Sequence, residues 1–263
     1  MVNIAILSSG TGNSSKILLE NIKNKTINSV VNVIVTNKAD AQIIELAKLY
    51  KISYIYLPKK KDISNINYDI QLLTILKSYN IDIIFLIGYM RIITSTIINN
   101  YKNKIFNIHP SLLPKYKNMM DLDIHEKVIE NNDLYTGCTL HIVEEEVDEG
   151  AIILQKKTKV LTNDKFELKN TVQELENECI LMCVKLIENN NIHNIIIYDN
   201  NTDNINNYVN NTDNINNYVN NMDNINNYVD NYYVDNNIND NIITYETYYK
   251  RRSYCCGIPF KIC

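Results

Sequence analysis

Apolar runs alternate with amphipathic stretches along the first 190 residues of the chain. Short, nearly continuous apolar runs are typical of strands that are covered on both faces, as in parallel sheets. Such runs lie at residues 4–7, 30–35, 54–57 and 81–87. Between them, a helical period predicts helices over residues 15–22, 39–50 and 68–79. This alternation predicts a doubly wound α/β fold, with a mostly parallel sheet and helices on both faces.

The second half of this region continues the alternation. The apolar pair Ile105-Phe106 marks the end of a strand, and a helix is expected near residues 122–130. Two strands near 138–143 and 151–155 and then a long amphipathic helix complete the region. We expect the buried face of that last helix to carry Leu168, Val172, Leu175, Cys179, Met182 and Leu186.

Beyond residue 190 the composition changes. Residues 201–210 and 211–220 are identical Asn-rich decapeptides, and residues 221–230 are a near copy. Residues 1–190 carry 22 Lys+Arg and 22 Asp+Glu, so the formal net charge of -4 belongs to the remaining 73 residues. We divide the chain into a globular domain, 1–190, and a disordered repeat tail, 191–263, which is either a solvated appendage or a partner-binding segment.

The rest of the composition excludes several classes of protein. No basic field indicates a nucleic-acid surface. The first residues lack the cationic segment and cleavage site of a signal peptide, and no segment suggests a membrane anchor. Six cysteines without Cys-x-x-Cys spacing favour free thiols in a reducing cytoplasm over disulfides or a metal site.

Residues 107–116 have the strongest chemical signature in the chain. Asn107 and His109 follow the end of a predicted strand, and two prolines restrict the backbone beyond them. The pair suits acyl transfer through a tetrahedral intermediate, in which the Asn107 amide donates to an oxyanion and His109 acts as acid or base. Ser111 lacks the Gly-x-Ser-x-Gly context of a nucleophilic serine.

An acidic residue downstream is a candidate partner for this imidazole. A carboxylate beside a histidine favours the charged ring, so Asp148 could make His109 a better proton donor. We interpret the acidic run before it, residues 144–146, as a solvated turn. We expect no functional role for the remaining histidines: His125 on a helix and His193 in the tail are solvated, and His141 is a strand residue with a satisfied ring.

Two glycine turns follow predicted strands. In the first, residues 8–15, backbone N–H groups near Gly12 could bind a phosphate. It matches neither the dinucleotide fingerprint nor a P-loop, and a plain turn with Asn13 or Ser14 as helix N-cap fits equally well. In the second, residues 88–93, Met90 could line an apolar slot for a flat heterocycle, or Arg91 could begin a solvated helix.

In this order and spacing, the residues resemble the phosphoribosylglycinamide formyltransferases, folate-dependent enzymes of purine synthesis. The resemblance covers roughly residues 3–188. It rests on segments 10–14, Asn37-Lys38-Ala39-Asp40, 88–93, 107–116, Thr136-Gly137-Cys138-Thr139 and Asp148-Glu149-Gly150 leading to Ile153-Leu154-Gln155. It implies formyl transfer from 10-formyltetrahydrofolate, as co-substrate, to the amine of 5-phosphoribosylglycinamide, without a metal.

The same resemblance implies three groups of site residues. The substrate phosphate and ribonucleotide would be held by Gly12, Asn13, Ser14, Gln173 and Glu176. The folate site would be bordered by Met90, Arg91, Ile92, Ile93 and Asn107. Asn107, His109 and Asp148 would be catalytic, with Asp148 keeping His109 charged.

The chain departs from the family pattern at two places. The family usually reads Gly-x-Gly-Ser-Asn at the phosphate loop, whereas here Asn13 precedes Ser14. The family often places an Arg near Asn65 to meet the folate glutamate, and Asn65 cannot form that ion pair. The basic run at residues 59–61 could compensate, although a solvated turn is the simpler interpretation.

Other functions on the same loop type stay open. Methionyl-tRNA formyltransferase would add a basic C-terminal β-domain, and formyltetrahydrofolate deformylase an N-terminal regulatory domain; the chain shows neither pattern. A non-catalytic binding protein would explain the exchanged loop residues. We expect a cytoplasmic enzyme, monomer or homodimer, that takes small-molecule substrates and binds neither nucleic acid nor membrane.

Overall fold

The computed structural model describes residues 1–189 and the dipeptide 243–244. Their strands form one sheet of order β7-β6-β5-β4-β1-β2-β3-β8. The strands are β1 (Asn3–Leu7), β2 (Val30–Thr36), β3 (Ser53–Tyr56), β4 (Ile83–Leu86), β5 (Ile105–His109), β6 (Tyr135–Ile142), β7 (Ile152–Lys159) and β8 (Ile243–Thr244). Pairing is parallel from β8 to β5 and antiparallel from β5 to β7. The predicted mostly parallel, doubly wound α/β fold is confirmed.

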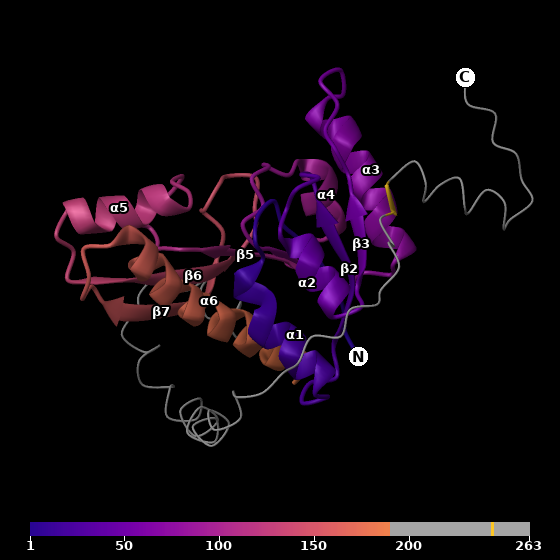
Figure 1. The fold of residues 1–263 in the computed structure, drawn as a ribbon. Helices are drawn as coiled ribbons and strands as arrows, with labels where there is room; N and C mark the ends of the chain where they lie inside the picture. Colours follow the sequence, from indigo (N-terminus) through magenta and orange to yellow (C-terminus); the bar gives the residue numbers. More distant parts are fainter. Residues whose placement is uncertain (190–242, 245–263) are drawn as a thin grey trace, which may run out of the picture.

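Helices cover both faces of this sheet (Figure 1). They are the 3-10 helix η1 (Asn13–Ser15), α1 (Lys16–Lys23), α2 (Ile43–Leu49), α3 (Asn65–Ser78), α4 (Ser95–Asn100), α5 (Leu122–Glu130) and α6 (Lys165–Glu188). One core cluster joins the sheet to α1, α2 and α6, and a second joins the opposite face to α3 and α4. Because burial of apolar area is the main favourable term in folding, these two clusters hold the layers together.

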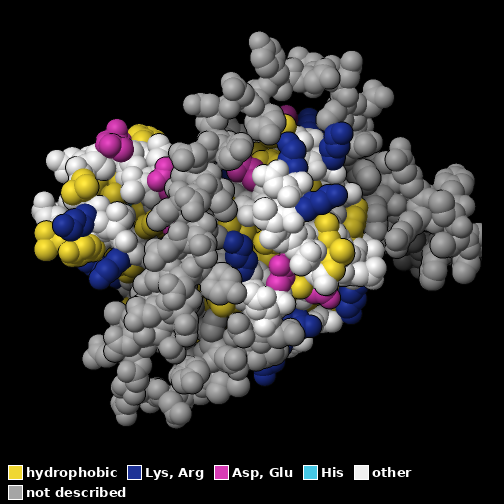
Figure 2. All heavy atoms as spheres, turned by 90° about the horizontal axis from the view of Figure 1, so that it is seen from below, with side chains coloured by type: hydrophobic (Ala, Val, Ile, Leu, Met, Phe, Trp, Pro, Cys, Tyr) yellow, Lys and Arg dark blue, Asp and Glu magenta, His cyan; other side chains and the backbone are white. Residues whose placement is uncertain are grey.

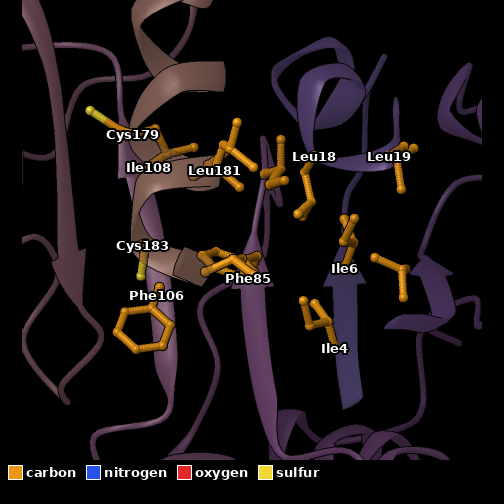
Figure 3. Packing of buried hydrophobic residues seen from close by; sticks show 14 of the residues in the cluster. Ile4, Ile6, Leu18, Leu19, Phe85, Phe106, Ile108, Cys179, Leu181 and Cys183 are labelled. Carbon is orange, nitrogen blue, oxygen red and sulfur yellow. The ribbon is translucent and has the colours of Figure 1, made fainter. Parts of the chain in front are cut away.

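Along β1, β3, β4 and β5, the buried side chains alternate between the two clusters. In Figure 3, Phe106 and Ile108 of β5 lie on the side of α6, near Leu181 and Cys183. The intervening β5 residues therefore face away from α6, where Ile105 joins the α3 and α4 cluster. This alternation sends Asn107 and His109 to the face opposite α6.

Several predicted boundaries are wrong, for identifiable reasons. The helix expected over 39–50 is shorter, since residues 37–42 form turns before α2. Helix α4 was not predicted, because six residues are too few for a clear helical period. Strand β5 continues beyond Phe106 to His109, since it pairs with β4 on one side and β6 on the other. Asn107 and His109 therefore belong to a strand end and not to a loop.

The buried face of α6 differs from the expected one in its second half. Leu168, Val172 and Cys179 are buried as predicted. Met182 and Leu186 are only half-buried, whereas Cys183 and its neighbours Ile180, Leu181 and Val184 are buried. The helix packs against both the sheet and the neighbouring α1, which widens its buried band.

The prediction that His125 is solvated is wrong. Helix α5 packs Ile124 and Val128 against Leu168 of α6, and this places the His125 ring at 1% exposure. Burial lowers the pKa of His125 to about 4, and a nearby Lys169 acts in the same direction. Within the described part of the chain, its Nδ1 atom has no hydrogen-bond partner.

The distribution of charged side chains and the state of three cysteines agree with what the composition predicts. Figure 2 shows basic and acidic side chains interspersed on the described part of one face. Cys138, Cys179 and Cys183 are buried free thiols, as predicted for these three.

No helix in residues 1–189 combines the length and apolarity needed to cross a membrane. The Asn-rich repeats, His193 and the last three cysteines lie outside the described residues, so the interpretation of the tail stays a prediction.

Candidate active site

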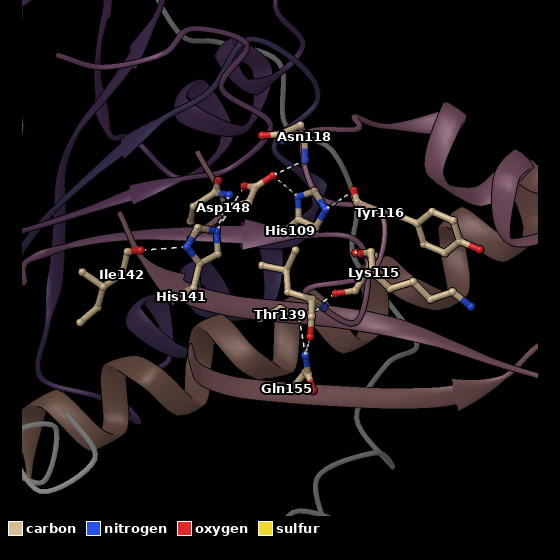
Figure 4. Close-up of polar contacts among 12 residues, drawn as sticks. His109, Lys115, Tyr116, Asn118, Thr139, His141, Ile142, Asp148 and Gln155 are labelled. Carbon is tan, nitrogen blue, oxygen red and sulfur yellow. Dashed lines mark hydrogen bonds and ion pairs between the residues drawn. The ribbon is translucent and has the colours of Figure 1, made fainter. Parts of the chain in front are cut away.

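Four polar side chains share one face of the β5–β6 pair, and Figure 4 labels three of them: His109, Thr139 and His141. Asn107 and His109 are two residues apart on β5 and so point to the same side. The antiparallel register places His141 opposite Asn107 and Thr139 opposite His109. Directly opposite residues in such a pair lie side by side on one face. The sheet therefore brings together two residues that the sequence predicted to be catalytic and two that it did not.

Asp148 joins this group from the loop between β6 and β7. Its Oδ2 atom lies 3.5 Å from His109 Nδ1, and its Oδ1 atom lies 3.5 Å from His141 Nε2. The loop folds back closely enough only because residue 150 is glycine: a Cβ there would lie 1.9 Å from the carbonyl oxygen of Ile142. The structure thus gathers Asn107, His109 and Asp148 around one space, with His141 as an additional member.

His141 fixes the orientation of Asn107. Its Nδ1 atom donates to the main-chain carbonyl of Ile142 at 2.8 Å, since a carbonyl oxygen can only accept. In the neutral ring, Nε2 is then an acceptor, and Asn107 Nδ2 donates to it at 3.0 Å. The amide nitrogen of Asn107 is thereby held toward the carboxylate side of the group. The interpretation of His141 as a satisfied strand residue was correct but missed its position in the site.

The proton on His109 can be assigned in the same way. Its Nε2 atom lies 3.1 Å from the main-chain carbonyl oxygen of Tyr116 and must donate to it. Nδ1, which faces Asp148, is therefore the nitrogen that gains and loses a proton. Burial lowers the pKa of His109, and this outweighs the opposing effects of Asp148 and the Tyr116 carbonyl. Asp148 acts in the predicted direction, but it does not by itself keep His109 charged.

Asp148 is ionised at neutral pH. Burial alone would raise the pKa of its carboxyl group, but its interactions with His141 and then with His109 lower the pKa below its usual value. The main-chain N–H of Asn118 also donates to its Oδ2 atom, at 2.9 Å. Because its pKa is lowered, Asp148 is a fixed negative charge beside the two imidazole rings, and it stabilises His109 when Nδ1 gains a proton.

Thr139 and Gln155 support the loop that follows His109. Thr139 Oγ1 donates to the carbonyl of Ser111 at 2.7 Å and accepts from Gln155 Nε2 at 2.9 Å. Gln155 Nε2 also donates to the carbonyl of Leu113, at 3.0 Å. The hydroxyl of Ser111 is buried and donates to the carbonyl of Lys115. Ser111 is thus part of the loop's support, in agreement with the interpretation that it is no nucleophile.

The first glycine turn connects β1 to η1. Gly12 has φ 65°, and a Cβ there would lie 2.5 Å from Ile43 Cδ1, so any other residue would be strained and would crowd Ile43. Neither Asn13 nor Ser14 caps a helix, which corrects that expectation. Instead, the buried hydroxyl of Ser14 donates to Glu176 Oε2 on α6, one turn beyond the half-buried Gln173.

The second glycine turn follows β4 and is fixed to the first. Met90 N–H donates to Ser9 Oγ at 2.9 Å, which ties the ends of β4 and β1 together. Met90 and Ile92 are exposed, as residues that border an apolar ligand would be, whereas Ile93 is buried in the core and offers no side chain to a ligand. Arg91 does not begin a helix.

Asn65 lies where the family often has an arginine, and in this chain its partner is Arg91. It accepts a 3.3 Å hydrogen bond from Arg91, whose guanidinium lies 4.0 Å from the ring centre of Tyr68. A guanidinium over an aromatic face is held by a cation–π interaction. Arg91 is therefore fixed beside Asn65 as the cationic group of this corner.

Comparison with known proteins identifies the family. Residues 2–184 match the formyl transferase family. The phosphoribosylglycinamide formyltransferase of Haemophilus influenzae is 36% identical over 167 residues, which cover 64% of this chain and 77% of that protein. The chicken trifunctional purine biosynthetic protein adenosine-3 is 33% identical over 192 residues, which are 73% of this chain but only 19% of that longer protein.

Solved structures agree with these matches. The phosphoribosylglycinamide formyltransferase of Bacillus halodurans superimposes with a TM-score of 0.65 at 32% identity, over 70% of this chain and 95% of that chain. Glycinamide ribonucleotide transformylase 1 of Symbiobacterium toebii gives 0.67 at 30% identity, over 71% and 87%. The chain belongs to the formyl transferase family, within the phosphoribosylglycinamide formyltransferases.

Proposed function

We propose that this chain transfers the formyl group of 10-formyltetrahydrofolate to the amine of 5-phosphoribosylglycinamide, a step of purine biosynthesis. The observation that carries the proposal is the ionised carboxylate of Asp148, which lies 3.5 Å from ring nitrogens of both His109 and His141. Relatives whose names state this activity align with this chain over most of their own length, which supports the same reaction here.

The chemistry follows from the geometry of the group. The substrate amine attacks the formyl carbon, a new C–N bond forms, and the formyl oxygen becomes an oxyanion. Asn107 Nδ2 is the donor available to that oxyanion, and His109 becomes a second donor once its Nδ1 has taken up a proton; one such donor is worth about 3 kcal/mol. The Asp148–His109 pair takes the proton released by the amine and returns it to N10 of the folate as the old C–N bond breaks.

The two glycine turns would supply the binding sites. The turn with Gly12, Asn13 and Ser14 would hold the phosphate, with Gln173 and Glu176 meeting the ribonucleotide. The turn from Met90 to Ile93 would border the folate through Met90, Ile92 and main-chain groups. We expect the enzyme to act in the cytoplasm as a monomer or homodimer.

A three-acceptor assay tests the proposal. The full-length chain is incubated with 10-formyltetrahydrofolate and one of three acceptors: 5-phosphoribosylglycinamide, methionyl-tRNA or water. Tetrahydrofolate release and the formylated product are followed by absorbance and mass spectrometry. We expect rapid transfer to the glycinamide amine alone. Preferential transfer to tRNA or to water would assign the chain to a sibling activity, and binding without turnover would leave it a binding protein.

A further inference from the structure

Asn13 and Ser14, adjacent in the first glycine turn, have different surroundings. Ser14 is 4% exposed, and its hydroxyl donates to Glu176 Oε2. Asn13 is half-buried, and among residues 1–189 its carboxamide makes no hydrogen bond. One side chain of the turn is therefore committed to the protein, and the other is available to a ligand.

The carboxylate of Glu176 depends on this contact. It is 6% exposed on the inner face of α6, where an ionised group loses most of its hydration. Within residues 1–189, the hydroxyl of Ser14 donates the hydrogen bond that this carboxylate accepts. One carboxylate oxygen, Oε2, takes that bond, which leaves Oε1 to accept from substrate hydroxyls.

The charged and titratable groups around Glu176 do not replace the missing hydration. Lys169, also on α6, is paired with Asp121, which precedes α5. Cys138 of β6 and Cys179 of α6 are buried free thiols whose Sγ atoms lie 3.7 Å apart. Burial raises the pKa of Glu176 to about 7, and the Ser14 hydrogen bond and Lys169 oppose the rise while Asp121 adds to it.

We propose that Ser14 is a positioning residue, whose hydroxyl keeps the Glu176 carboxylate ionised and oriented to bind the ribonucleotide, and that this hydroxyl does not itself bind the phosphate. This inference rests on the proposed function. The polar side chain of the turn that contacts the phosphate is then Asn13. The order Asn13-Ser14 matters, because the small hydroxyl occupies the buried position and the larger amide the open one.

Replacement of Ser14 separates this role from direct phosphate binding. In Ser14→Ala, we expect the KM for 5-phosphoribosylglycinamide to rise about 10-fold at pH 7, the effect of losing one hydrogen bond to a charged group. Because the Ser14 hydroxyl favours the ionised carboxylate, its loss moves the titration of Glu176 to higher pH. The KM should therefore recover substantially by pH 9, with kcat changed less than about 3-fold.

A double-mutant cycle gives the decisive comparison. If Ser14 acts through Glu176, then Ser14→Ala should change the KM less than about 2-fold in the Glu176→Gln background. Asn13→Ala is the matched control: it should raise the KM equally at every pH and should add fully to Glu176→Gln. A Ser14→Ala effect that is the same at every pH, or the same in both backgrounds, would overturn the proposal.

A measurement without turnover keeps this inference separate from the proposed function. The full-length chain is labelled with ¹³C at the glutamate side-chain carboxyl, and the Glu176 signal is assigned by its loss in Glu176→Gln. The midpoint of its titration should lie at higher pH in Ser14→Ala than in the wild type. An unchanged midpoint would refute the Ser14–Glu176 coupling even in an active enzyme. A shifted midpoint in a chain that does not formylate the ribonucleotide would refute only the proposed function.

Discussion

The Oδ2 atom of Asp148 lies 3.5 Å from His109 Nδ1, although His109 ends strand β5 and Asp148 lies in the loop that follows strand β6. His109 Nε2 already donates to a main-chain carbonyl, so Nδ1 is the nitrogen that exchanges protons with the substrates. The pair is therefore arranged to exchange a proton with the substrates.

The first prediction concerns this pair. Asp148→Asn removes the ionised partner but keeps the shape of the side chain, and His109→Ala removes the titrating nitrogen. We expect either change to lower kcat by about 10²- to 10⁴-fold, the usual contribution of a positioned acid or base. Binding of the ribonucleotide, measured by isothermal titration calorimetry, should be nearly unchanged. Near-normal kcat in either variant would exclude that residue from the chemistry.

The second prediction concerns the pairing of Asn107 with His141. Asn107→Ala removes an oxyanion donor and should lower kcat by about 10²- to 10³-fold. His141→Leu removes the acceptor that orients the amide, so a smaller loss of roughly 10-fold in kcat is expected. Because His141 acts partly through Asn107, the losses should be less than additive in the double variant. Steady-state kinetics of the four proteins would reveal this, and fully additive effects would show that the two side chains act independently.

The sequence predicted the parts of the site that lie in local patterns. Asn107 and His109 stand out because two polar residues follow an apolar strand end, and Asp148 because it follows an acidic run and lies two residues before Gly150. His141 could not be found in this way, since its place opposite Asn107 depends on the register of an antiparallel pair. A signal was present in retrospect: His141 and Thr139 alternate with apolar residues and so mark a polar face of β6.

The remaining errors have the same origin in tertiary packing. His125 resembles a solvated helix residue in isolation, and only the packing of α5 against α6 buries it. The contact between Ser14 and Glu176 joins segments 162 residues apart, which no local pattern reveals. Elements with strong periodicity were located well, and the contacts between elements were not.

The third prediction follows from the buried His125 ring. Its pKa is about 4 in the folded protein and near the ordinary value of 6.5 in the unfolded chain. Between these values the unfolded chain binds a proton that the folded protein does not, so stability should fall as the pH drops from 6.5 toward 4. The loss is at most about 3 kcal/mol.

Urea unfolding at several pH values from 7 to 4.5 measures this effect. The variant His125→Leu has no titrating group at this position and should lack this part of the pH dependence. It should also be at least as stable as the wild type at low pH. Parallel stability curves for the two proteins would contradict the prediction.

The fourth prediction tests the glycine that brings Asp148 into place. In Gly150→Ala, the new Cβ would lie 1.9 Å from the carbonyl oxygen of Ile142, so the loop must shift. Overpacking of this kind typically costs about 1–3 kcal/mol, and a displacement of about 1 Å in the carboxylate can lower kcat about 10²-fold. Gly10→Ala is the control for stability, because a Cβ there has no atom within 4 Å and its φ is unremarkable. Thermal unfolding should therefore distinguish the two variants, with a lower Tm for Gly150→Ala alone. Equal Tm values and a normal kcat in Gly150→Ala would mean that the loop accommodates the methyl group without moving Asp148.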